Sequence, residues 1–185
     1  DWGAYERQTP GVRYVDRDAI GSGAGYSWTN AITDLQEALD FAGSGDELWV
    51  AEGVYLPTAG SDRTVSFALR NGVAIYGGFA ATETARNQRN PAAHTTMLSG
   101  NIGNSNSSND NSYSVVRNTN INATAILDGV TISGGYANGA GCPGSACGGG
   151  ILNESSSPAL TNITISANFA SSGGGIANHA SSPAL

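Results

Sequence analysis

The chain has no lysine, few charged residues of any kind and only two cysteines in 185 residues. Its eight cations are all arginines, and its formal net charge is −7. Binding to nucleic acid or to an anionic membrane surface requires basic patches that this composition does not provide. No apolar run approaches the roughly 18 residues of a membrane-spanning helix. We therefore expect neither a nucleic-acid partner nor a transmembrane helix.

The few charges are concentrated in the first half of the chain. Positions 1–92 hold 19 of the 23 charged residues, and the remainder are Asp110, Arg117, Asp128 and Glu154. Asparagine is distributed in the opposite way, with 13 of its 17 residues after position 92. Short uncharged polar side chains compete for backbone hydrogen bonds and favour turns over exposed helices. The second half is therefore expected to consist of strands and turns.

One helix is expected, at about residues 33–42. Leu35 and Leu39 recur with helical spacing, and Thr33 and Gln36 have the spacing of a capping box. Elsewhere short apolar runs are separated by Gly, Pro, Asn and Asp, which is typical of strands. The expected strands are Tyr14–Val15, Leu48–Val50, Val54–Leu56, Val65–Leu69, Val73–Tyr76, Met97–Leu98, Tyr113–Val116 and Ala125–Ile132.

The end of the chain contains a repeat of 25 residues. Gly148-Gly-Gly-Ile151 recurs as Gly173-Gly-Gly-Ile176, and two copies of Ser-Ser-Pro-Ala-Leu have the same offset. A weaker similarity relates the segment from Leu127 to a segment from Leu160, at an offset of 33. The extra residues of the longer repeat lie in the stretch that contains both cysteines.

A repeat of this length, built from short strands and small turn residues, indicates a solenoid. The regular leucine ladder of leucine-rich repeats is absent, so a parallel β-helix fits better. We predict an all-β chain in two parts: residues 1–45 form an N-terminal cap that includes the helix, and residues 46–185 form the coils. The chain stops inside a repeat, at Leu185. We therefore expect the remainder of a longer solenoid, or a partner, to cover the open C-terminal coil.

Several segments resemble bacterial right-handed parallel β-helix proteins. Gly45-Asp-Glu-Leu-Trp-Val-Ala-Glu-Gly-Val-Tyr55 looks like their capping end, and Leu127-Asp-Gly-Val-Thr-Ile-Ser-Gly-Gly135 continues the match. The Gly-Gly-Gly-Ile segments resemble the passenger repeats of polymorphic outer-membrane proteins. This resemblance covers roughly residues 12–185 and implies a right-handed, pectin-lyase-like solenoid. It implies an extracellular or bacterial cell-surface location but no particular activity, because the same fold hosts lyases, hydrolases, adhesins and fibres.

Cys142 and Cys147 enclose the sequence Pro-Gly-Ser-Ala. A zinc site would need further ligands at matched spacing, and a redox pair usually has two intervening residues rather than four. Two alternatives remain, a loop-closing disulfide and a pair of free buried thiols. We predict the disulfide, which would indicate an oxidising compartment. No metal site and no cofactor are expected.

No catalytic residue is assigned. The β-helix lyases that this chain resembles use Lys or Arg as the base and acidic clusters that hold calcium. Arg117 has no acidic cluster near it in the sequence and is expected to be solvated. Glycoside hydrolysis needs two carboxylates about 5–9.5 Å apart. Asp128 and Glu154 occupy different repeat positions, and Asp128 is expected to form a turn with Gly129.

Two further features are candidate binding or catalytic sites. Most aromatic residues are expected to pack in the core or the cap, and Trp28, beside a polar turn, is the best exposed candidate for stacking on a sugar. At the repeat offset of 25, Glu154 stacks on His179, and such a pair can transfer protons. An incidental surface pair is the favoured interpretation.

The expected function is that of a non-enzymatic extracellular or cell-surface segment, a stalk or adhesin with a polysaccharide or other cell-surface molecule as candidate ligand. The alternative is the N-terminal part of a polysaccharide lyase or glycoside hydrolase whose active coils lie beyond residue 185.

Overall fold

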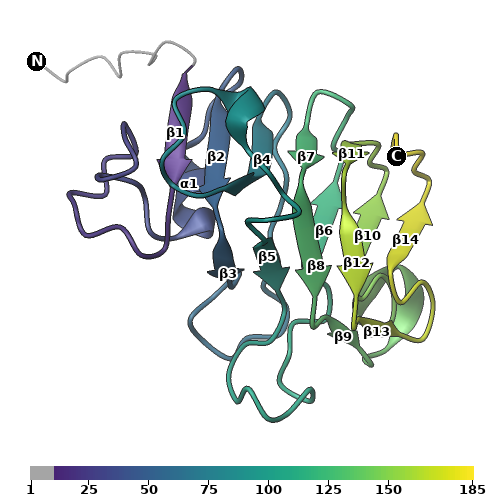
Figure 1. Cartoon of the computed structure of the whole chain (residues 1–185). Coiled ribbons are helices and arrows are strands. Elements are labelled where there is room, and N and C mark those ends of the chain that lie inside the picture. The colour runs from purple at the N-terminus through teal and green to yellow at the C-terminus, as the bar shows by residue number, and fades with distance from the viewer. Residues whose placement is uncertain (1–10) are drawn as a thin grey trace, which may run out of the picture.

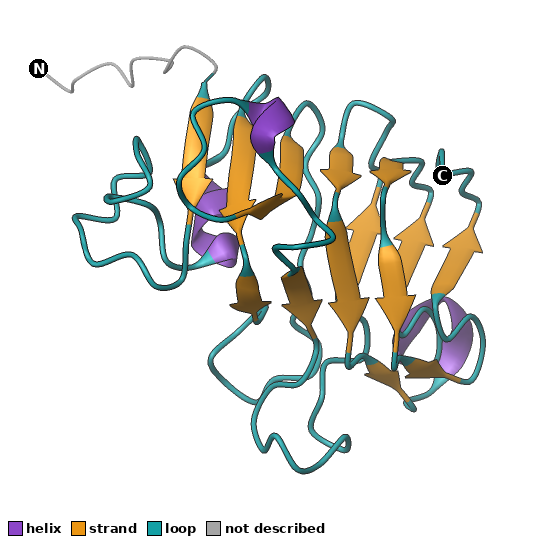
Figure 2. Cartoon of the chain, viewed as in Figure 1, coloured by secondary structure: helices purple, strands orange, loops and turns teal. Residues whose placement is uncertain are grey.

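The chain is largely β, and the strands of all its sheets are parallel. A computed structural model describes residues 11–185, so the first ten residues of the predicted cap, with Trp2, lie outside the described part. The strands form several sheets whose neighbours come from successive parts of the chain (Figures 1 and 2). This arrangement is compatible with a parallel β-helix.

Four sheets make up the structure. The five-stranded sheet contains β1 (Val12–Val15), β2 (Glu47–Ala51), β4 (Ala74–Phe79), β7 (Ile126–Asp128) and β11 (Ala159–Thr161). The four-stranded sheet contains β3 (Gly53–Tyr55), β5 (Thr96–Ser99), β8 (Val130–Ser133) and β12 (Thr164–Ser166). The two smaller sheets contain β6 (Val116–Thr119), β10 (Ile151–Glu154) and β14 (Ile176–His179), and β9 (Tyr136–Ala137) and β13 (Phe169–Ala170).

The two repeat offsets in the sequence are the registers of the strand pairs. Ile151 of β10 pairs with Ile176 of β14, which is the offset of 25. Leu127 of β7 pairs with Leu160 of β11, which is the offset of 33. The extra residues of the longer repeat leave the sheets between β9 and β10, where they form the irregular helical turn η2 (Gly141–Ser145).

Two predicted strands are wrong or misplaced: Tyr113–Val116 overlaps β6 (Val116–Thr119) at Val116 alone, and Val65–Leu69 forms no strand. In the segment Val65–Leu69 only Phe67 forms a β-bridge, to Val116. The backbone N–H of Leu69 donates to the side chain of Asn118, at 3.1 Å, rather than to a backbone carbonyl. A side-chain oxygen therefore takes the place of the backbone carbonyl that would continue the strand pairing.

The predicted helix is present as α1 (Leu35–Phe41), but its cap differs from the prediction. Asp34, not Thr33, is the N-cap, and its carboxylate accepts hydrogen bonds from the N–H groups of residues 36 and 37. Leu35 and Leu39 are each 1% exposed and belong to the main hydrophobic core. The helix thus closes the core beside β1, which is an edge strand of its sheet (Figure 1).

A ladder of asparagine side chains runs through the core side of β6, β10 and β14. The Asn118 amide donates to the Asn153 amide oxygen at 2.8 Å, and the Asn153 amide donates to Asn178 at 2.9 Å. Asn118 and Asn153 are fully buried. Because the strands are in register, each amide meets an identical amide, and buried polar groups find partners without water.

Two glycines of the first triplet are explained by close backbone approach. A Cβ on Gly149 would collide with the carbonyl oxygen of Phe169, and a Cβ on Gly150 would collide with that of Gly175. These two positions therefore require glycine.

Replacing Leu39 by Asp should lower the free energy of unfolding by at least about 3 kcal/mol, because it places an unpaired carboxylate in the core. Urea unfolding measures the change. Phe41→Asp is the matched control, since Phe41 lies on the same helix but is 76% exposed, and its change should stay below about 1 kcal/mol. Equal effects of the two variants would show that α1 does not close the core.

Asn153→Ala should cost about 1–3 kcal/mol, because it leaves the buried Asn118 amide without an acceptor. Asn178→Ala should cost less, since Asn178 is exposed and water can replace its side chain. Thermal unfolding of both variants tests the ladder. A neutral Asn153→Ala would show that the ladder does not contribute to stability.

Candidate functional site

The structure has a cleft of about 680 Å³ on the outside of the sheets. One wall is the segment around the short helix η1 (Arg86–Gln88), which crosses the face of β4. The other walls are the bends that join β7 to β8 and β11 to β12. The side chains that line it are mainly Arg, Asn and Thr.

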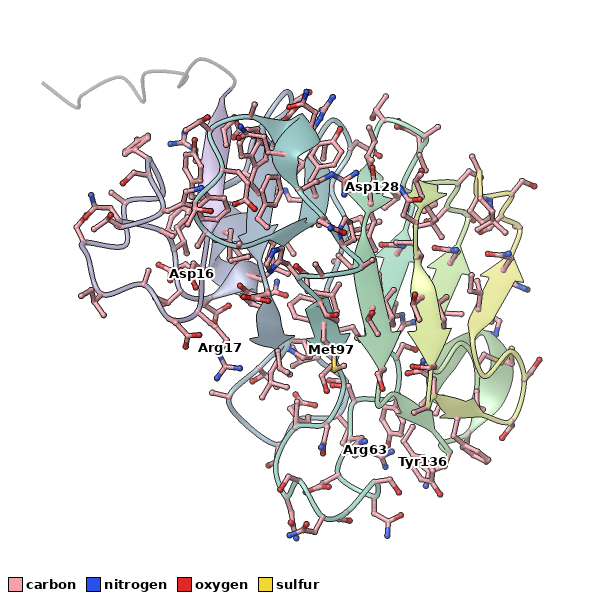
Figure 3. All side chains as sticks on the ribbon, viewed as in Figure 1. Asp16, Arg17, Arg63, Met97, Asp128 and Tyr136 are labelled. Atoms are coloured by element: carbon pink, nitrogen blue, oxygen red, sulfur yellow. A yellow bond between two sulfur atoms is a disulfide. The ribbon has the colours of Figure 1, made fainter. Side chains whose placement is uncertain are left out.

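A largely buried ion pair holds Arg89, one of the residues that line this cleft. Arg89 Nη2 and Asp128 Oδ2 are 2.6 Å apart, and the two side chains are only 15% and 13% exposed. Arg89 also donates to the Gly77 carbonyl, and the Asn162 amide donates to the second oxygen of Asp128 at 2.9 Å. Figure 3 shows Asp128 at the end of its strand. The interpretation of Asp128 as only a turn residue is therefore incomplete, because its carboxylate binds two neighbouring segments.

Arg86 extends the same network to β2. Its guanidinium is 2.7 Å from Glu47 Oε1 and lies over the Tyr76 ring, 4.5 Å from the centroid. The Arg89 guanidinium lies over the same ring at 5.3 Å. Burial of Tyr76 raises the pKa of its phenol above the ordinary value, and the two arginines oppose that shift. The cleft is therefore rigid and polar, with each arginine held by a carboxylate and an aromatic ring.

This geometry favours binding. Both carboxylates beside the cleft, Glu47 and Asp128, accept hydrogen bonds from arginines. The amide and hydroxyl groups of the lining offer donors and acceptors to a hydroxyl-rich ligand.

The second candidate, Glu154 and His179, has the predicted register but a different partner. The two residues are Cα partners in β10 and β14. The Glu154 carboxylate, however, accepts a hydrogen bond from Arg117 Nε at 2.9 Å. Arg117 is exposed, as expected for a solvated residue, and its guanidinium also binds Glu154 on the adjacent strand. The stacking is confirmed, and the carboxylate is used in an ion pair.

Trp28, the predicted sugar-stacking residue, packs among other aromatic side chains. Its ring is 4.7 Å from that of Tyr14 and 5.5 Å from that of Phe79, and its indole N–H donates to the Glu83 carbonyl. The expectation of an exposed platform is wrong. The packing role expected for most aromatic residues holds for this one as well.

The predicted disulfide between Cys142 and Cys147 is present, so the free-thiol alternative is wrong. It closes the loop that projects between β9 and β10. Within residues 11–185, no three His, Cys, Asp or Glu side chains lie close enough to hold a metal ion. No helix in that range is long and apolar enough to cross a membrane.

Sequence reasoning missed Arg86 and Arg89. Each is paired with a carboxylate 39 positions away, and no local pattern reports such a contact. Comparison with protein-family models, with curated proteins and with solved structures finds no match to this chain.

Replacing Arg89 by Gln should lower the free energy of unfolding by about 3 kcal/mol, because Asp128 is left buried without its cation. Arg117→Gln is the control, since its pair with Glu154 is more exposed, and it should cost less than about 1 kcal/mol. Denaturant unfolding of both variants gives the comparison. If Arg89→Gln is neutral, the ion pair does not hold the cleft together.

Proposed function

We propose that this chain is part of a right-handed parallel β-helix. Support comes from the registers, since parallel strands pair at the offsets of the sequence repeat and each sheet adds strands from successive segments. Inward and outward side chains alternate as such a fold requires: Val130 and Ile132 are buried while Thr131 is partly exposed. The N-terminal helix serves as the cap of the first coil.

The proposed function is that of a non-enzymatic stalk or adhesin segment of an extracellular or bacterial cell-surface protein. One observation carries it: the charged side chains of the cleft, Arg86 and Arg89, are held in ion pairs that join separate parts of the fold. They serve the architecture and leave a polar groove beside it. The disulfide is consistent with an oxidising compartment.

The proposed ligand is a polysaccharide that lies in the cleft. Sugar hydroxyls are recognised by planar amide and guanidinium donors in a fixed arrangement, and the cleft supplies these from Arg86, Asn87, Asn90 and Asn162. The hydroxyls of Thr131 and Thr164 add donors and acceptors on the opposite wall.

The proposed partner at the other end of the molecule is further solenoid or another chain. Strands β14, β12 and β13 each have a strand neighbour on one side only among the described residues. Ile165 and Ile176 beside them are only partly buried. Unpaired edges with apolar residues beneath favour coverage by additional strands.

A glycan array with neutral and acidic polysaccharides tests the proposed function. We expect binding that Arg86→Gln weakens about tenfold, the loss of one charged hydrogen bond, and that Arg117→Gln, outside the cleft, leaves unchanged. Incubation with the bound polysaccharide should release neither reducing ends nor unsaturated uronates.

Two results would contradict this proposal. Binding that is equal in wild type and Arg86→Gln would place the ligand elsewhere. Release of sugar products would favour the lyase or hydrolase alternative over the non-enzymatic function.

A further inference from the structure

Buried oxygen atoms without a hydrogen-bond partner are concentrated in one polar loop, residues 101–112. Five such side-chain atoms occur among the described residues, and the one outside the loop belongs to Gln36. The other four are Asn101 Oδ1, Asp110 Oδ1, Asn111 Oδ1 and Ser112 Oγ. Buried acceptors in native proteins are almost always satisfied by protein, water or an ion. Four of them in a single loop make this loop a candidate site for a bound ion or ordered water.

The backbone brings the two ends of this loop together. The N–H groups of Ile102 and Ser112 both donate to the Gly100 carbonyl, at 2.8 and 2.9 Å. The two ends of the loop therefore meet at Gly100, and Asn101 and Asn111, ten positions apart, are each adjacent in sequence to one of these bonded residues.

Two side chains reach across the interior of the loop. Asp110 Oδ2 accepts a hydrogen bond from the Asn104 N–H at 2.6 Å. The Asn101 amide donates to the Ser105 carbonyl at 3.5 Å. Each side chain is held by one of its polar atoms, and the remaining oxygen of each, Oδ1, is buried without a partner.

Asn111 has the third buried side-chain oxygen of this loop. The residue is 6% exposed, and its amide nitrogen donates to the Gly134 carbonyl at 2.6 Å, which leaves Oδ1 as the free acceptor. Gly134 is adjacent to Asn101, since a Cβ built on it would lie 3.2 Å from the Asn101 nitrogen. The amide heads of Asn101 and Asn111 therefore belong to one small region.

We propose that this loop binds a calcium ion through the side-chain oxygens of Asn101, Asp110 and Asn111. Calcium takes carboxylate, amide carbonyl and water oxygens in irregular arrangements, whereas magnesium demands a near-ideal octahedron and retains its waters. The ligand set is different from an acidic cluster, because two of its three oxygens are neutral. Ser112 Oγ, fully buried at the neck of the loop, is a further available oxygen.

The charges around the loop predict weak binding. Asp110 is its single carboxylate. Arg63 Nε donates to the Asn111 carbonyl at 2.6 Å, and its Nη2 donates to the Tyr136 carbonyl (Figure 3), so a cation is already present at the base of the loop. The expected dissociation constant is about 10⁻⁴–10⁻³ M, the range of extracellular calcium modules.

Calorimetric titration of the EDTA-treated protein with calcium chloride tests the proposal, with magnesium chloride as the comparison. Asp110→Asn keeps the shape of the side chain and removes its charge, so it should weaken calcium binding about tenfold or more. Asp18→Asn, the same charge change at a side chain 82% exposed, is the control and should have no effect. Calcium at ten times its dissociation constant should raise the melting temperature of the wild type by about 3–5 °C.

Two results would overturn the proposal. Absence of binding and of a melting shift at about 10 mM calcium, in a protein whose circular dichroism shows it folded, would mean that ordered water satisfies these oxygens. Binding that Asp110→Asn leaves unchanged, or that Asp18→Asn weakens equally, would assign the ion to the general surface. Since Asp110 lies outside the cleft, neither result bears on polysaccharide binding.

Discussion

The parallel backbone ladder between strands 25 to 52 residues apart is the interaction on which the rest of this structure depends. It fixes which side chains are neighbours, because a residue lies beside its register partner in the adjacent strand. Apolar residues then stack on apolar residues to make the core. The ladder also explains the asparagine row, in which Asn118 and Asn153 are bonded to each other inside that core and Asn153 donates to the exposed Asn178.

The regular strands carry little of the candidate chemistry, which lies instead on the segments that leave them. The segment around η1 forms a wall of the cleft, loop 101–112 carries the buried oxygens, and the disulfide closes the projection between β9 and β10. A rigid scaffold with variable connections is a common arrangement for binding proteins. Two of these connections are tied back to the sheets by an arginine: Arg89 binds Asp128, and Arg63 binds the carbonyls of Asn111 and Tyr136.

This use of arginine explains why the few cations of the chain are all arginines and none is a lysine. With no lysine in the chain, each cation is a planar guanidinium that can make several directed hydrogen bonds. Arg89 reaches a carboxylate and two carbonyls, and Arg86 pairs with Glu47 while covering the Tyr76 ring. The few charges of the molecule thus join separate segments, which supports an architectural role for them in the proposed surface protein.

The sequence by itself determined the repeat, and the repeat determined the register of the last strands and the position of the disulfide loop. The spacing of apolar residues separately determined the helix at Leu35–Phe41. These features follow from local spacing and from similarity between neighbouring repeats, and both can be read from the sequence alone. Only the tertiary structure decided that Asp34 caps the helix, that Trp28 is packed, and that Arg89 meets Asp128 and Arg117 meets Glu154. The physical reason is that the ion pairs and the ring packing join side chains 14 to 51 positions apart, and their meeting depends on how the connections fold over the sheets.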